Sequence, residues 1–239
     1  MDPRGIIPYL AFTEPFSSLS HFGGALALLL LAARLFGHVR GCPRRTRAIA
    51  LYLLGVGGMF LASGTYHFLE HGSLAHRVFW HLDHAMIWAA IVTTISAVQV
   101  LAGVGTRRAI RAVWLLGAAG VIAEQFVLRG LAPWISPLLY IAMGWVGLFP
   151  FLRLIRLHGF RFAAPLAWAG LFSTLGGACD ALEWPMLVPG VVEGHEVMHL
   201  LIVAGMGCFA WAVDRCARLT PRDTALLRGE FETPPAVAA

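Results

Sequence analysis

The sequence contains no lysine, and charged residues of all kinds make up only 13% of its 239 residues. Hydrophobic residues make up 58%, and the mean hydropathy is +0.72, far from the usual balance of a soluble domain. This composition excludes an ordinary soluble protein and predicts an integral membrane protein. The basic residues behind the net charge of +5 are all arginine, and no stripe of basic and aromatic residues predicts a nucleic-acid partner.

Cysteine is also scarce, and the four residues of this type show no paired spacing: Cys42, Cys179, Cys208 and Cys216. We therefore expect no disulfide framework. The first 17 residues lack the short basic segment, apolar run and small-residue cleavage site of a signal peptide. We expect the first membrane helix to direct insertion.

Seven apolar runs, separated by clusters of arginine and proline, are long enough to cross a bilayer as helices. They cover residues 20–36, 48–69, 79–102, 109–128, 135–157, 162–182 and 195–213. The runs are joined by short connections and show no internal repeat. The sequence predicts an all-α, seven-transmembrane helix bundle over residues 20–214, preceded by an N-terminal segment (1–19) and followed by a polar, disordered C-terminal tail (215–239).

Arginines divide unequally between the two ends of such a bundle. Three of the 18, Arg4, Arg77 and Arg129, fall at the end where the chain begins, and the other 15 fall at the opposite end. Since cytoplasmic loops carry the arginine excess, we predict that the N-terminus lies outside the cell and the C-terminus in the cytoplasm.

Histidines divide the opposite way, which points to chemistry at the arginine-poor end. Eight of the ten lie there: His21, His67, His71, His76, His81, His84, His195 and His199. On a helix, His195 and His199 share one face, and His67 ends another span at the same depth. Three imidazoles with an open fourth position form the ligand set of a catalytic zinc. We predict a metal site from these three, whereas His71, His76 and His81, in or beside a short loop, fit interfacial residues better.

The string His195-Glu196-Val197-Met198-His199 is also the signature of zinc proteases in which the glutamate is the general base. A membrane metalloprotease is a minor hypothesis here, because the string lies in the last span and no later aspartate motif follows it.

Five short motifs follow one another along the chain: Glu14-Pro15-x-Ser17-x-Leu19-Ser20-His21-x-x-Gly24, Ser63-x-x-x-His67, Leu82-Asp83-His84-Ala85, Tyr140-x-x-Met143-Gly144-Trp145 and Gly194-His195-Glu196-x-x-His199. In these motifs and their order the chain resembles the hemolysin III proteins, the bacterial branch of the progestin and adipoQ receptor family, which is related to the alkaline ceramidases. The resemblance implies a seven-helix protein of the cell inner membrane that binds Zn2+ through His67, His195 and His199. It also implies that Asp83 binds or polarises a zinc-bound water and that Ser63 supports this water by a hydrogen bond.

Two features depart from the family. The segment Val92-Thr93-Thr94-Ile95-Ser96 replaces a small-Gly-Thr-Tyr-Thr-Pro segment, so the lower wall of a pocket is expected to differ. The family is usually drawn with its N-terminus in the cytoplasm, opposite to the arginine distribution.

Further polar residues lie at the histidine end. Glu124, Asp180 and Glu183 fit residues that line a cavity, partners of the zinc ligands or interfacial residues. Glu14 and His21 fit a pair that holds the first span against the bundle.

Two functions remain open from the sequence. One is a zinc-dependent hydrolase of a lipid-like amide or ester that enters from the bilayer, with Asp83 and Ser63 as catalytic residues. The other is a non-catalytic, zinc-stabilised receptor-like or membrane-homeostasis protein. A pore-forming lytic factor is less favoured because no span carries a long polar stripe. Membrane lipids are the expected partners, and the sequence leaves the oligomeric state open.

The predicted topology can be measured with reporter fusions. A reporter that is active only in the cytoplasm should be active at the C-terminus, and one that is active only outside should be silent there. The reverse pattern would contradict the arginine-based orientation.

Overall fold

The computed structural model describes residues 14–128 and 131–220, and this part of the chain is a bundle of eight helices without strands. The helices are α1 (Pro15–His38), α2 (Pro43–Phe68), α3 (Leu74–Leu101), α4 (Arg107–Phe126), α5 (Ile135–Trp145), α6 (Leu148–His158), α7 (Phe160–Ala181) and α8 (Gly194–Arg218). They form seven segments long and apolar enough to cross a membrane, with α5 and α6 counted together. The predicted all-α, seven-span fold is confirmed.

The first three helices each begin five residues before the apolar run that predicted them. Pro15 and Pro43 occupy the first turns of α1 and α2, where the missing proline N–H costs nothing. Ser73 caps α3, because its hydroxyl accepts a hydrogen bond from the backbone N–H of His76 at 3.0 Å. The helix limits therefore follow these start signals, whereas the apolar runs mark only the hydrophobic portion.

The fifth span is not one continuous helix, as the run 135–157 predicted, but breaks between α5 and α6. At the break, the N–H groups of Val146 and Gly147 bond to carbonyls three residues back, at 3.2 and 2.9 Å. Pro150 explains the break, since it has no N–H to donate to the Val146 carbonyl and its ring crowds that position.

The helices extend into both segments that were predicted to flank the bundle. Helix α1 begins at Pro15, within the predicted N-terminal segment 1–19, and α8 continues to Arg218, within the predicted tail 215–239. The predicted disorder of the tail concerns mainly residues 221–239, which lie outside the described residues.

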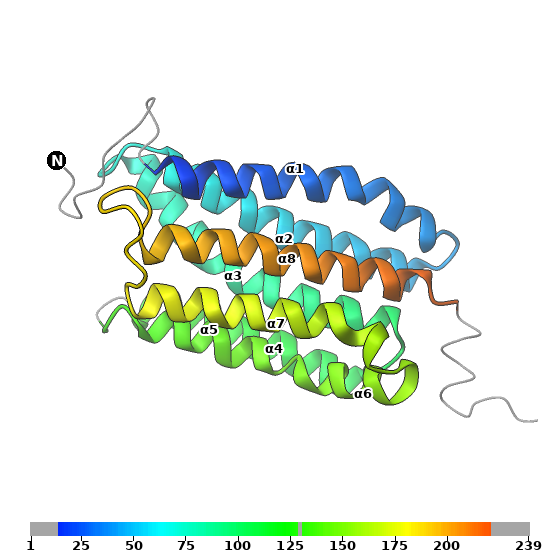
Figure 1. Cartoon of the computed structure of the whole chain (residues 1–239). Helices are drawn as coiled ribbons and strands as arrows, with labels where there is room; N and C mark the ends of the chain where they lie inside the picture. The colour runs from blue at the N-terminus through cyan, green and yellow to red at the C-terminus, as the bar shows by residue number, and fades with distance from the viewer. Residues whose placement is uncertain (1–13, 129–130, 221–239) are drawn as a thin grey trace, which may run out of the picture.

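Helices α2 and α3 form the centre of the bundle and are its most buried spans. Helix α1 packs against α2 and α8, α8 packs against α7, and α4 and α5 complete the other side (Figure 1). The last helix thus lies next to the first, so residues from the two ends of the sequence share one interface.

Small residues allow neighbouring helices to approach closely. A Cβ atom added to Gly55 on α2 would lie 2.2 Å from the Thr93 hydroxyl on α3, and one added to Gly120 on α4 would lie 2.3 Å from the ring of Trp88. Since lipid chains are as apolar as leucine, membrane helices associate largely through such close contacts.

The outer helices carry large apolar side chains on their exposed faces. Leu30 on α1 is 74% exposed, Leu115 on α4 is 71% exposed, and Phe149 on α6 is 77% exposed. A continuous surface of this kind is unstable in water and fits contact with lipid chains. The protein is therefore a multi-pass membrane protein.

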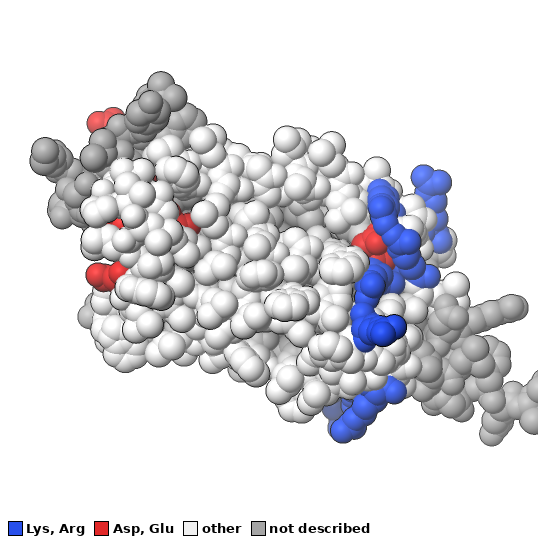
Figure 2. Space-filling view, viewed as in Figure 1, with Lys and Arg blue, Asp and Glu red and all other residues white. Residues whose placement is uncertain are grey.

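Charged side chains gather at the two ends of the bundle, with arginines at one end and most acidic residues at the other (Figure 2). At the arginine end, the guanidinium of Arg34 donates two hydrogen bonds to Asp214, at 2.9 and 3.1 Å. Arg218, one helical turn after Asp214, donates to the same carboxylate. This cluster joins the end of α1 to the end of α8.

The contact at Gly55 can be tested by substitution. Gly55→Ala should destabilise the protein by about 1–3 kcal/mol, because the methyl group overlaps Thr93 and has no free volume. Thermal unfolding of the purified protein in detergent measures this as a lower Tm.

Gly57→Ala on the same helix is the matched control, because its Cβ would meet only a Leu28 methyl at the ordinary distance of 3.7 Å. Equal Tm values for the two variants would contradict the close packing of α2 on α3.

Candidate metal centre

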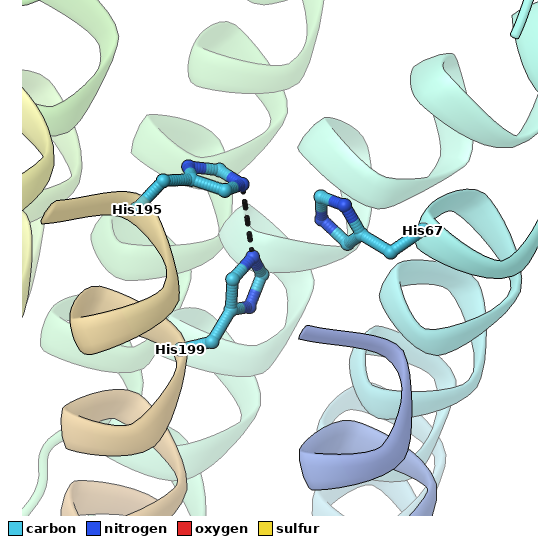
Figure 3. Close-up of side chains that lie close together, drawn as sticks. All are labelled: His67, His195 and His199. Atoms are coloured by element: carbon cyan, nitrogen blue, oxygen red, sulfur yellow. Dashed lines mark hydrogen bonds between the residues drawn. The ribbon is translucent and has the colours of Figure 1, made fainter. Parts of the chain in front are cut away.

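Three imidazoles from two helices converge at the acidic end of the bundle (Figure 3). His67 lies in the last turn of α2, and His195 and His199 lie in the first two turns of α8. One potential ligand atom from each lies within 4.8 Å of the others. The structure therefore brings together the three residues that the sequence predicted as metal ligands.

Each of the three imidazoles uses one ring nitrogen for a hydrogen bond away from the group. For His67 the partner is Glu14, whose carboxylate oxygen lies 2.5 Å from Nδ1. An ionised carboxylate can only accept, so Nδ1–H of His67 donates and Nε2 keeps its lone pair. Glu14 is almost completely buried, and its backbone N–H also donates to the His67 carbonyl at 3.1 Å. The start of α1 is thus attached to the end of α2.

The second imidazole, His195, is oriented by the end of α7. Its Nδ1 lies 2.9 Å from Oδ1 of Asp180, which accepts the Nδ1 proton and again leaves the Nε2 lone pair free. The side chain of His195 is 37% exposed, whereas that of His67 is 2% exposed. The group is therefore buried on the His67 side and accessible beside His195.

The third imidazole, His199, contacts another histidine. Its Nδ1 lies 2.9 Å from Nε2 of His21 on α1, in a buried position. When Nδ1–H of His199 donates to His21, all three ligand histidines hold the same tautomer, with the Nε2 lone pairs directed inward.

The inward nitrogens fit a metal ion. Nε2 of His195 and Nε2 of His199 are 3.1 Å apart, and Nε2 of His67 is buried without a hydrogen-bond partner. Two lone pairs facing each other repel unless a proton or a cation lies between them. A tetrahedral zinc ion with Zn–N bonds of about 2.0–2.1 Å would separate its nitrogens by about 3.3 Å. The donor set, its spacing and the outer hydrogen bonds all suit a divalent transition metal.

Asp83 and Ser63, the predicted catalytic residues, are both buried near this end of the bundle but lie outside the group of three imidazoles. Ser63 lies one helical turn before His67 on α2. Asp83 is on α3, with its carboxylate 3.8 Å from Nδ1 of His84. Among the described residues, no hydrogen bond or ion pair links Asp83 to the three imidazoles.

Glu196, the glutamate of the protease-like string, is part of a helix cap. Its carboxylate accepts a hydrogen bond from the backbone N–H of Glu193 at 3.0 Å, and the Glu193 side chain accepts in return from the Glu196 backbone. This reciprocal cap gives the glutamate after His195 a structural role at the start of α8.

The remaining polar residues at this end form separate contacts. His71 and His76 lie 3.0 Å apart, and His71 also approaches Glu14, at 3.6 Å. Glu124 accepts a hydrogen bond from the Ser136 hydroxyl at 3.0 Å and contacts none of the three imidazoles. Glu183 lies in the turn after α7, where its backbone N–H donates to the Asp180 carbonyl.

Two residues have roles beyond those predicted. Glu14 and His21 were expected only to hold the first span in place, yet they orient His67 and His199. For Asp180, the structure favours the alternative of a partner to a zinc ligand. A signal for these roles exists in the sequence, since each metal-binding histidine needs an acceptor for its outer nitrogen. The sequence does not say which polar residue meets which histidine.

A membrane bundle of seven spans with three convergent histidines at one end is the class of protein that this fold and site define. A family model described as haemolysin-III related matches residues 9–210, and the chain belongs to this family. The resemblance to the hemolysin III proteins is confirmed. No curated protein matches the chain.

The metal content of the purified protein tests the centre. The wild-type chain should hold about one zinc ion, and His67→Ala, His195→Ala and His199→Ala should each lose it, because two imidazoles bind far more weakly than three. Glu14→Ala and Asp180→Ala should weaken binding about 10–100-fold by releasing the imidazole orientation.

His84→Ala is the control, because its imidazole bonds to the Trp80 carbonyl and lies outside the group. Full metal content in all three ligand variants would exclude this centre.

Proposed function

We propose that this protein is a zinc-dependent membrane hydrolase that cleaves an amide or ester bond of a lipid-like substrate. The observation that carries this proposal is the convergence of three inward Nε2 atoms at a point that is buried on one side and accessible beside His195. A catalytic site needs such an accessible side for water and substrate, whereas a purely structural zinc site is closed by a fourth protein ligand.

Zinc, when bound by His67, His195 and His199, would supply a Lewis acid that polarises a carbonyl oxygen and lowers the pKa of water. The protein's part is to hold the three imidazoles in one tautomer and orientation. Glu14, Asp180 and His21 provide this, at distances of 2.5 to 2.9 Å from the outer nitrogens.

Asp83 is assigned the role of general base, and Ser63 that of hydrogen-bond donor. A buried carboxylate at this end of the bundle can accept a proton from the attacking water through Oδ1 or Oδ2 and return it to the leaving group. The Ser63 hydroxyl, one turn from His67, can donate to the oxygen on which negative charge develops. Both assignments follow the family motifs that these residues match.

A lipid-like substrate fits the surroundings of the site. The loop between α7 and α8, directly before His195, exposes several large apolar side chains: Leu182, Trp184, Met186 and Leu187, each 61% or more exposed. Such a loop at the end of a membrane bundle fits contact with the bilayer interface. A substrate that is dissolved in the bilayer would meet the accessible side of the site without first entering water.

A second candidate is a non-catalytic protein in which zinc only stabilises the bundle. It is favoured by the origin of the ligands and their partners, which come from α1, α2, α7 and α8 and so connect distant segments. A bound ion would then join the first and last helices without turning over a substrate.

Hydrolysis of a panel of lipid amides and esters distinguishes the two functions. Wild-type protein should release free fatty acid, and Asp83→Asn should lower the rate about 10²–10⁴-fold, since the amide cannot act as a base. Ser63→Ala should lower it about 10²–10³-fold through loss of one donor. Zinc content should be unchanged in both variants.

Glu183→Gln is the matched control, because it removes an acidic group from the same end without touching the imidazoles. Equal release by wild type and Asp83→Asn, or no release by either while zinc is bound, would favour the non-catalytic candidate.

A further inference from the structure

A basic groove lies at the arginine end of the bundle, at the opposite end of the helices from the imidazoles. It has a volume of about 410 Å³ and lies between the first turns of α2 and α4 and the last turn of α3. Its lining consists of four arginines and two apolar residues: Arg44, Arg47, Arg107, Arg111, Val100 and Ile110.

The four arginines that line the groove form two pairs. Arg44 and Arg47 are three residues apart on α2, and Arg107 and Arg111 are four residues apart on α4, so each pair shares one helix face. Both helices begin here, and the positive ends of their dipoles add to the potential. All four arginines are exposed residues, and Nε of Arg47 also donates a hydrogen bond to the Pro43 carbonyl, at 3.3 Å.

In the part of the chain that the structure describes, acidic side chains do not balance the charge of this groove. Asp214 is the one acidic residue at this end among residues 14–128 and 131–220, and Arg34 and Arg218 already hold it. Within the same ranges, no carboxylate lies at ion-pair distance from any of the four groove arginines. Four like charges around one concave site favour an external anion strongly.

We propose that this groove binds the phosphodiester headgroup of an anionic phospholipid. Arginine suits this ligand, because its planar guanidinium donates two parallel hydrogen bonds to phosphate oxygens. Basic pockets between membrane helices at the level of the headgroups have the geometry for such binding. Val100 and Ile110 supply apolar walls for the glycerol and the first methylenes of the acyl chains, which inorganic phosphate lacks. The occupant is therefore a lipid and not a free anion.

Lipid retention by the full-length protein tests the proposal. The protein is purified in detergent with equal amounts of phosphatidylglycerol and phosphatidylcholine, and the bound lipids are counted by native mass spectrometry. Wild type should retain phosphatidylglycerol selectively. The double variant Arg44→Gln/Arg107→Gln, with one change from each helix, should weaken retention about 30-fold, as expected for two lost charges next to anionic headgroups.

The double variant Arg108→Gln/Arg156→Gln is the charge-matched control, since both arginines are exposed at the same end but do not line the groove. It should retain the lipid as wild type does, and equal losses in the two double variants would overturn the proposal in favour of diffuse attraction. Unchanged retention in the groove variant would also overturn it. Zinc content and Tm equal to those of wild type establish that the groove variant is folded.

Inorganic phosphate distinguishes the two sources of the anion. Inorganic phosphate at the same concentration as the lipid should leave phosphatidylglycerol bound, because phosphate makes no apolar contact with Val100 and Ile110. Full displacement would show that the groove takes the free anion and would overturn the assignment to a lipid.

Discussion

A neutral imidazole carries a proton on one nitrogen and a lone pair on the other, and a hydrogen-bond acceptor for the proton decides which nitrogen can face a metal. This constraint governs the group of three imidazoles. Glu14 and His21 come from the start of α1, and Asp180 comes from the end of α7. The three imidazoles that could bind a metal lie on α2 and α8. In an environment of low polarity each of these hydrogen bonds is strong, and a buried polar group that lacks its partner destabilises the fold. The geometry of the three imidazoles therefore depends on the relative positions of four packed helices. The close glycine contacts of the bundle help to fix those positions.

The bilayer explains why the charged and histidine side chains lie at the two ends of the bundle. Charged groups are expensive in the apolar interior, so acids and histidines collect at one end and arginines at the other (Figure 2). The two ends differ in how their charges are satisfied. At the histidine end, carboxylates are used to orient imidazoles, whereas at the arginine end a single described carboxylate, Asp214, serves two arginines and leaves others without a counterion. At one end the polar side chains converge on the three imidazoles, whereas at the other end exposed arginines face outward, where an anion could reach them.

The sequence predicted the seven spans from long apolar runs, and His195 and His199 from their four-residue spacing on one helix. His67 followed from its place at the end of another span at the same depth. The helix limits were less predictable from hydropathy, since Pro15, Pro43 and Ser73 start their helices before the apolar runs begin. The break at Gly147 depends on Pro150, a single residue within an otherwise continuous run. The pairing of Glu14 with His67 depends on two helices meeting in space, and no spacing in the sequence encodes that. The same holds for Asp180 and His195. Glu196 was open from the sequence and proved to be a helix cap.

The position of Glu14 directly before the first helix has a consequence for biogenesis. During synthesis Glu14, His21 and His67 enter the membrane early, with α1 and α2, and form only part of the centre. His195 and His199 arrive with α8, after all other helices have been inserted. The three imidazoles that could hold a metal therefore come together only when the last helix has docked beside the first. Metal binding would then be a late step of assembly, and a bound ion would stabilise the finished chain against unfolding.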